Sequence, residues 1–298
     1  MLHRTVVLPF PVDLPGTFAS IRRGSGDPTC RIAADGVWRA SRSPAGPATV
    51  HLVARGDRID ATAWGEGAEA ALDAVPNVVG VHDDDQGFAP GHPVVARLWR
   101  DLGRRRIPRT GAVTEALVAS VLEQRVTTYE ARRAQHQLVA RWGEPAPGPT
   151  DLRLPPDPEV LAGLAYYDLH VLGVEKKRAD TVRRVAAGAR RLDALAMLPP
   201  SEGHRRLCDV AGVGPWTAAE VARVALGDPD AVPVGDVHLP RDLTWVLTGE
   251  AVDDDDAMLA ALEPFAGQRG RVIALVGAAG LRAPRRAPRY APRDIRGA

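Results

Sequence analysis

Lysine is nearly absent from this sequence. Among its 298 residues only Lys176 and Lys177 are lysines, so arginine supplies almost all of the 38 basic side chains. These are balanced by 37 acidic residues, which leaves a formal net charge of +1. The overall charge therefore excludes a strongly basic or strongly acidic protein and by itself says little about partners.

Cysteine and long apolar runs are scarce as well. Cys30 and Cys208 are too few for a disulfide framework, and their spacing is unlike that of metal ligands. No apolar run approaches the roughly 20 residues that a helix needs to cross a bilayer, and residues 1–16 lack the apolar core of a signal peptide. We therefore expect a cytoplasmic protein, and its 45% hydrophobic content excludes a disordered chain.

Short segments with β-branched or alternating apolar residues fill residues 1–92, separated by Gly, Pro and Asp turns. They predict a small antiparallel sheet, with one helix beside it at residues 68–75. The expected strands are 4–10, 29–34, 36–41, 48–55 and 58–64.

From residue 93 the apolar residues recur at helical spacing, which predicts an all-helical region over 93–281. A capping box from Thr127 to Glu130 is expected to start a new helix, and residues 145–158 read as a surface connection. The tail, 282–298, is rich in Arg and Pro and either lies on the surface or contacts a phosphate backbone. The expected helices include 113–126, 130–142, 178–192, 216–226 and 256–266.

A glycine-punctuated turn, Gly212-Val213-Gly214, joins a helix at 204–210 to another that begins at Pro215. Glycines allow a tight turn and a close approach by another molecule, and the amides at the start of the second helix could bind phosphate. A simple corner between two helices is the alternative.

Asp236 lies within the apolar run 231–239. A buried, unpaired carboxylate is costly, so we expect the protein to use it. The alternative is a helix cap for the segment that follows.

The hairpin and the downstream Asp236 resemble the helix-hairpin-helix DNA glycosylase superfamily. The segments "VTEALVASVLEQRVT", "LGVEKKRADTVRRVA", "GVGPWTA" and "VPVGDVHL" extend the match over nearly the whole chain. They are most similar to the 3-methyladenine DNA glycosylase II branch.

This resemblance implies an α+β fold in which an antiparallel sheet domain precedes a two-lobed helical region. The implied activity is monofunctional hydrolysis of the N-glycosidic bond of a flipped, cationic alkylated purine in double-stranded DNA, in base excision repair, by a monomer without a cofactor. Asp236 matches the catalytic carboxylate, which would stabilise an oxocarbenium-like state. Trp216 stands where members with lyase activity carry the Schiff-base lysine, and no cysteine follows Cys208, which excludes the iron-sulfur branch.

The resemblance also implies a base pocket. Trp216 would stack on the base, with core packing as the alternative. Glu220 would either accept a hydrogen bond from the base or pair with Arg223 on the surface. Gln268 and Tyr166 are further candidates, although a core or surface position is favoured for Tyr166.

Contacts to the DNA backbone are implied for the hairpin and for the residues that would fill the gap left by the flipped base. Gln124 and Arg125 occupy the gap-filling position, with a buried Gln124 and an exposed Arg125 as the alternative. Hairpin carbonyls at Val210 and Val213 would hold a structural monovalent cation. The expected DNA-binding residues are Gly212, Val213, Gly214, Thr217, Gln124, Arg125 and Lys177.

Other functions stay open at this stage. The chain could be a glycosylase for deaminated or other neutral lesions, or a non-catalytic DNA-binding protein that keeps the hairpin. The arginine cluster at residues 100–111 either contacts phosphates or forms a solvated face.

Overall fold

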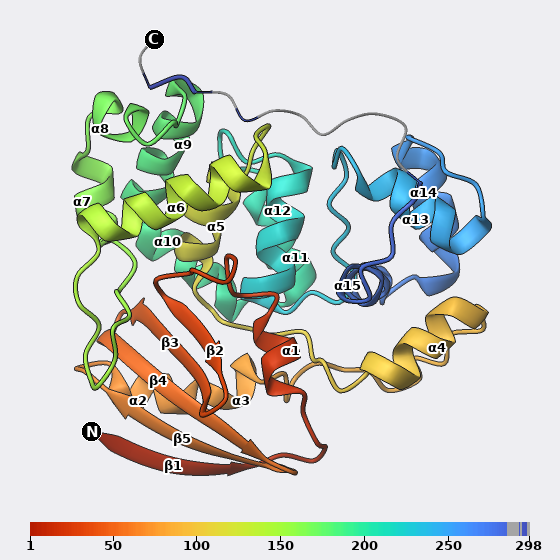
Figure 1. Cartoon of the computed structure of the whole chain (residues 1–298), viewed down its shortest axis with the longest axis horizontal. Coiled ribbons are helices and arrows are strands. Elements are labelled where there is room, and N and C mark those ends of the chain that lie inside the picture. Colours follow the sequence, from red (N-terminus) through yellow and green to blue (C-terminus); the bar gives the residue numbers. More distant parts are fainter. Residues whose placement is uncertain (285–291, 293, 297–298) are drawn as a thin grey trace.

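A computed structural model describes residues 1–284, 292 and 294–296 of the chain. One antiparallel sheet and three groups of buried apolar side chains organise it, and a fourth, smaller group lies behind the sheet. Figure 1 shows the sheet below the helices, with the chain passing from the sheet into two groups of helices. The α+β fold expected from the sequence is confirmed.

The sheet has the strand order β1-β5-β4-β3-β2, and every neighbouring pair is antiparallel. Alternation explains its faces: Ile59, Ala61 and Ala63 of β5 are fully buried on one side, against Leu72 and Phe18. The strands are β1 (Leu2–Val7), β2 (Cys30–Ala33), β3 (Gly36–Ser43), β4 (Gly46–Arg55) and β5 (Arg58–Trp64).

The other face of the sheet is covered by the connection at residues 145–158, which the sequence predicted to lie on the surface. Residues 145–158 are not only a surface connection, because Leu152 and Leu154 are buried against Trp38. Trp38 also stacks on Trp64, with ring centroids 5.5 Å apart. The connection covers the sheet because alternation exposes two large indoles there that water would otherwise contact.

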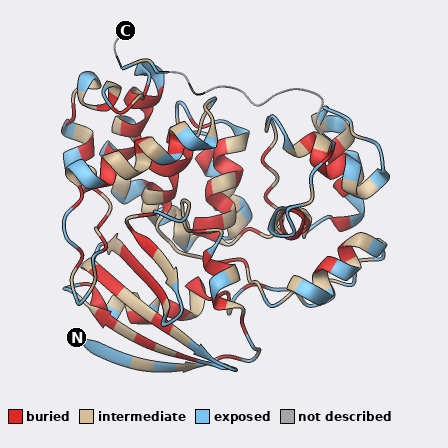
Figure 2. Ribbon diagram, viewed as in Figure 1, coloured by how far each residue is buried: buried red, intermediate tan, exposed pale blue. Residues whose placement is uncertain are grey.

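The first helical lobe is built around α5, in which every residue except Glu115 is buried. Such a helix must lie inside its lobe, because it has no polar face for water. Figure 2 shows the buried side of the helices turned toward one another. This lobe and the helices beside the sheet comprise α1 (Leu14–Phe18), α2 (Ala68–Asp73), α3 (Val75–Val78), α5 (Val113–Leu122), α6 (Thr128–Trp142), α7 (Pro158–Gly163), α8 (Tyr166–His170), α9 (Lys176–Ala187), α10 (Ala189–Asp193), η1 (Ala194–Met197), α11 (Pro200–Leu207), α12 (Pro215–Val221) and η2 (Ala222–Leu226).

The second lobe has its own apolar core, which includes Val95, Leu243, Met258 and Val272. Its helices come from distant parts of the sequence, because α4 precedes the first lobe and the others follow it (Figure 1). They are α4 (Pro93–Leu102), α13 (Leu239–Thr248), α14 (Asp255–Leu262), η3 (Glu263–Phe265) and α15 (Arg269–Ala278).

Helix starts follow the local signals in the sequence. The capping box of Thr127 and Glu130 is present at the start of α6, and Asp254 accepts a hydrogen bond from Ala257 N at the start of α14. Gly188 separates α9 from α10, where one helix was predicted. None of the helices in the described part of the chain has the length and hydropathy needed to span a membrane.

Candidate active site at the helical hairpin

The two glycines of the hairpin between α11 and α12 have different roles. Gly212 has φ +93°, and a Cβ added there would lie 2.3 Å from Thr181 Oγ1, so the turn itself requires glycine. Gly214 has an ordinary extended backbone, and a Cβ there would meet nothing within 4 Å. Between them, Val213 is buried and holds the turn onto the first lobe. Gly214 is therefore the part of the hairpin that is open to an approaching molecule.

Asp236 lies between the hairpin and the start of α13, and it is neither unpaired nor fully buried. Its Oδ1 accepts hydrogen bonds from His238 N (2.8 Å) and Leu239 N (2.9 Å), and its Oδ2 accepts one from Trp216 Nε1 (2.9 Å). The expectation of an unpaired buried charge was wrong, because helix amides and an indole satisfy the carboxylate. The capping alternative is confirmed only in part: His238 is the N-cap residue of α13, while Asp236 accepts from the amides at the helix start and leaves Oδ2 turned toward the hairpin.

The loop that carries Asp236 is attached to the second lobe. Gly235 N donates to Asp255 Oδ2 (3.0 Å), and Gly235 has φ +89°, which favours glycine. Val237 is 73% exposed. Asp236 is thus held from α13 and α14 on one side and from Trp216 of α12 on the other. Nothing in the sequence indicated this contact between Gly235 and Asp255.

Trp216 is half-buried at the start of α12. Its indole N–H is used by Asp236, so its first role in the structure is to orient that carboxylate. The sequence predicted a stacking surface for a base, and the indole face remains the candidate for that role.

Gln124 connects the end of α5 to the hairpin. Its Nε2 donates to Gly212 O (3.0 Å) and to Thr217 Oγ1 (2.9 Å). The prediction for Thr217 needs correction: its side chain is 2% exposed and its hydroxyl serves Gln124, so the side chain does not reach solvent or DNA. Gln124 thus joins the end of α5 to the hairpin, a contact that the sequence did not predict.

Arg125 follows Gln124 and is exposed, with φ +54°. It is the one non-glycine residue with positive φ in the described part of the chain, and this conformation is unfavourable for a side chain with a Cβ. Behind it, buried Arg178 donates to Leu122 O (2.9 Å) and Gly173 O (3.2 Å), and burial lowers the pKa of Arg178. Nothing in the sequence indicated that Arg178 supports this turn.

Lys177 lies exposed in the first turn of α9, near the hairpin, since Thr181 of the same helix faces Gly212. On the same side, Arg184 Nη1 donates to Ala211 O (2.9 Å). Lys177 keeps its place as a candidate phosphate contact.

Glu220 lies one helical turn after Trp216 and pairs with Arg223, whose Nη2 donates to Glu220 Oε2 (2.8 Å). The sequence favoured such a pair, but on the surface. The side chains of Glu220 and Arg223 are only 16% and 19% exposed.

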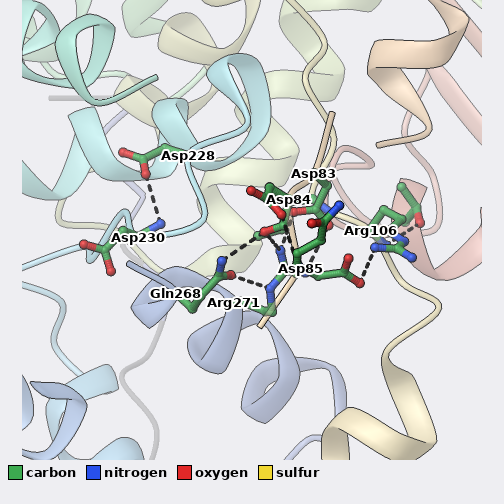
Figure 3. A network of polar contacts seen from close by, with 11 residues as sticks. Asp83, Asp84, Asp85, Arg106, Asp228, Asp230, Gln268 and Arg271 are labelled. Atoms are coloured by element: carbon green, nitrogen blue, oxygen red, sulfur yellow. Dashed lines mark hydrogen bonds and ion pairs between the residues drawn. The ribbon is translucent and has the colours of Figure 1, made fainter. Parts of the chain in front are cut away.

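Gln268 is not free to read a base. Its Nε2 donates to Asp84 O (3.0 Å), and its Oε1 accepts from Arg271 Nε (2.6 Å). Figure 3 shows Gln268 pointing into this network, which centres on the buried pair of Arg271 and Asp83. The assignment of Gln268 to the base pocket is therefore corrected, because both ends of its amide are already used.

Tyr166 does not belong to the site either. It packs against the core of the first lobe, and its hydroxyl bonds His170 Nδ1 (2.9 Å). Its helix, α8, lies at the far side of that lobe from the connection between α12 and α13 (Figure 1). Tyr166 therefore forms a local pair with His170, one helical turn later.

The arginine cluster at 100–111 is mostly used within the protein. Arg105 pairs with Asp13 (3.1 Å), Arg106 lies over the ring of Phe10 (3.7 Å), and Arg109 donates to Leu198 O (3.2 Å). Arg105 and Arg106 contact the segment between β1 and α1, and Arg109 contacts the segment between η1 and α11, which neither alternative had anticipated. Of the Arg/Pro-rich tail, residues 285–291, 293 and 297–298 lie outside the described residues.

Carbonyl oxygens of the hairpin are the only cation ligands that the sequence suggested. Val210 O already accepts a hydrogen bond from Val213 N (2.9 Å), and its second lone pair remains available to a ligand. Among the described residues, no group of three or more His, Cys, Asp or Glu side chains could hold a metal ion.

Solved structures of other proteins share the fold of this chain. The 3-methyladenine DNA glycosylase from Archaeoglobus fulgidus aligns with a TM-score of 0.77 and 17% identity, covering 92% of this chain and 97% of that chain. The Clostridium acetobutylicum 8-oxoguanine glycosylase/lyase, in complex with double-stranded DNA, aligns with a TM-score of 0.71 and 13% identity, covering 93% and 97%. At these identities the likeness shows the fold.

No protein-family model matches this chain. Two curated relatives are similar to it in sequence. A probable bifunctional transcriptional activator/DNA repair enzyme AlkA from Mycobacterium tuberculosis is 30% identical over 252 residues, 79% of this chain and 50% of the relative. The putative DNA-3-methyladenine glycosylase YfjP from Bacillus subtilis is 28% identical over 153 residues, 50% of this chain and 52% of the relative. The chain spans about half the length of the curated relatives it matches. The chain is therefore similar in sequence to proteins named as a DNA repair enzyme and as a 3-methyladenine glycosylase, and it shares its fold with solved DNA glycosylases.

Proposed function

We propose that this protein is a DNA glycosylase of base excision repair that hydrolyses the N-glycosidic bond of a damaged base after flipping it out of the duplex. The observation that carries the proposal is the Asp236 carboxylate, held by three hydrogen bonds beside the hairpin. Relatives named for 3-methyladenine glycosylase and DNA repair support it.

Asp236 would act on the sugar. Departure of the base leaves positive charge on the deoxyribose, and a fixed carboxylate stabilises that charge without reorganising during the reaction. The amides of His238 and Leu239 orient Oδ1, and the Trp216 indole orients Oδ2. Asp236 can also orient the attacking water.

Double-stranded DNA would bind across the hairpin. Backbone amides around Val213 and Gly214 would bind phosphate without reading sequence, and Lys177 would add a charge. Arg125 would fill the gap left by the flipped base, and its strained backbone supports that role, because strain gathers at functional positions. Carbonyls of Val210 and Val213 would hold a monovalent cation, which supplies positive charge beside the phosphate.

The substrates would be cationic alkylated purines, and the enzyme would not cut the DNA backbone. A cationic base already has a weakened glycosidic bond, so stacking on Trp216 and the charge of Asp236 could suffice. Helix α12 carries no lysine from which a Schiff base could form.

Mass spectrometry of the bases released from duplex DNA carrying mixed lesions tests this function. We expect 3-methyladenine and 7-methylguanine among the products, with the sugar-phosphate backbone intact until alkali is added. Preferential release of hypoxanthine or uracil would indicate the neutral-lesion alternative. Binding without release of any base would indicate a DNA-binding protein that lacks the reaction.

Gly214→Val is expected to weaken binding to damaged and undamaged duplexes alike by about tenfold, because a side chain would project from the part of the hairpin that meets phosphate. The fold should be unaffected, since nothing lies within 4 Å of the new Cβ. Fluorescence anisotropy at several salt concentrations measures the affinity. Gly212→Val is the contrasting variant, which should unfold at a lower temperature. Normal binding by folded Gly214→Val would place the phosphate anchor elsewhere.

Trp216→Phe is expected to slow excision by about tenfold, the usual effect of removing one hydrogen bond to a charged group. The ring that would stack on the base is retained, so affinity for damaged DNA should change little. Trp216→Ala should lose affinity as well, because base stacking contributes roughly 1 to 3 kcal/mol. Single-turnover rates and dissociation constants separate the two effects. A wild-type excision rate in Trp216→Phe would mean that the indole N–H contributes nothing, and equal losses in both variants would mean that stacking contributes nothing.

A further inference from the structure

One line of residues along α12 and η2 is not covered by the first lobe. Between Thr217 and Leu226 every residue is buried except Glu220 and Arg223. Trp216 and Glu220 share one face of α12 at i, i+4 spacing, and Arg223 of η2 pairs with Glu220 at i, i+3 spacing. Trp216 at the start of this face donates to Asp236, so this end of the face lies beside the Asp236 carboxylate.

Glu220 and Arg223 form a sheltered ion pair on this face. The bond from Arg223 Nη2 to Glu220 Oε2 uses one nitrogen and one oxygen. Arg223 Nε is buried and has no hydrogen-bond partner among the described residues. A buried donor without a partner is costly, so the described chain leaves one donor of this guanidinium unsatisfied, where an acceptor on a ligand would stabilise it.

The backbone at Arg223 is unusual and is stabilised from outside the helix. It lies in η2, a π-helical turn, whose carbonyls at Val224 and Ala225 accept hydrogen bonds from Thr110 N (3.1 Å) and Gly111 N (3.0 Å). Such turns are frequent at functional sites. The fold therefore holds Arg223 in a fixed position.

We propose that the Glu220–Arg223 pair reads the hydrogen-bonding edge of the extruded base, an inference that rests on the proposed glycosylase function. The pair offers the Arg223 Nε donor beside the Glu220 Oε1 acceptor. It selects purines whose Watson–Crick edge carries both an acceptor and an N–H donor, as in 7-methylguanine and 3-methyladenine. It disfavours 1,N6-ethenoadenine, in which a ring closed across N1 and N6 removes the N–H donors and leaves Glu220 facing a lone pair.

The test measures binding in an Asp236→Asn background, so that excision does not consume the DNA. Dissociation constants are determined for duplexes containing 7-methylguanine, 1,N6-ethenoadenine or an abasic-site analogue. The unaltered pair should bind 7-methylguanine at least about tenfold more tightly than ethenoadenine. Glu220→Gln and Arg223→Met should each reduce this preference to within about threefold, and affinity for the abasic duplex should not change.

Glu202→Gln is the matched control. Glu202 pairs with Arg205 at the same i, i+3 spacing on α11, but that pair is exposed. The control should keep the full preference, and circular dichroism should show all variants folded. If Glu220→Gln retains the same preference as Glu202→Gln, the base-reading role is overturned.

The same variants separate this inference from the proposed function. With Asp236 restored, release of methylated bases tests the glycosylase reaction directly. A protein that releases no base, yet whose binding preference depends on Glu220, contradicts the reaction and supports the base-reading pair. If the protein releases methylpurines and its binding preference does not depend on Glu220 or Arg223, the glycosylase reaction is supported and the base-reading role of the pair is contradicted.

Discussion

Asp236→Asn is expected to lower the single-turnover rate of base excision by about 10²-fold or more, the effect usually seen when one electrostatic stabiliser is removed from an enzyme. The amide keeps the shape of the side chain, and its oxygen can still accept from the amides of His238 and Leu239 at the start of α13. Affinity for damaged DNA should therefore remain within a few-fold. Rapid-quench measurement of base release, together with anisotropy, gives both quantities.

The position of the Trp216 indole adds a detail to this expectation. Asparagine would place either its oxygen or its NH₂ group near Trp216 Nε1, and the NH₂ group cannot accept the indole hydrogen bond. Asp209→Asn is the control. Asp209 is exposed just after α11, and this substitution removes the same charge near the hairpin. Excision by Asp236→Asn at the rate of Asp209→Asn would exclude Asp236 from the mechanism.

Arg271→Met is expected to lower the free energy of unfolding by about 3 to 5 kcal/mol, because it leaves the buried carboxylate of Asp83 without its charged partner. The side chains are 2% and 0% exposed, and Arg271 Nη1 donates to Asp83 Oδ2 (3.0 Å). The guanidinium also lies 5.4 Å from the ring of Trp99 and 5.8 Å from that of Phe88. Urea unfolding followed by circular dichroism measures the change.

Arg269→Met supplies the comparison on the same helix. Arg269 pairs with Asp230, but both side chains are more than a quarter exposed, so its loss should cost about 1 kcal/mol or less. A double variant, Asp83→Leu with Arg271→Met, should recover part of the stability, since it removes both buried charges. If Arg271→Met is no less stable than Arg269→Met, the buried pair does not hold α15 to the segment that contains Asp83.

Local signals in the sequence located most elements of the fold. Strand β5 was predicted with its observed bounds, because its alternation of buried and open residues is a property of neighbouring positions. The start of α6 followed from the capping box of Thr127 and Glu130, which needs no contact beyond one helical turn. The prediction that residues 145–158 form only a surface connection was wrong. Part of this connection is buried against Trp38, which is far away in the sequence, so no local signal could show it.

The candidate site divides in the same way. Residue type and spacing in the sequence drew attention to the hairpin glycines and to Asp236, and the family resemblance added the predicted roles of Asp236 and Trp216. Only the tertiary structure decided how they act: it gave the Asp236 carboxylate its indole donor, joined Gln124 to Gly212 across 88 residues, and drew Gln268 into the network of Arg271 and Asp84. The bonds from Gln124 to Gly212, from Trp216 to Asp236 and from Gln268 to Asp84 join positions far apart along the chain, so they form only when the folded chain brings those segments together.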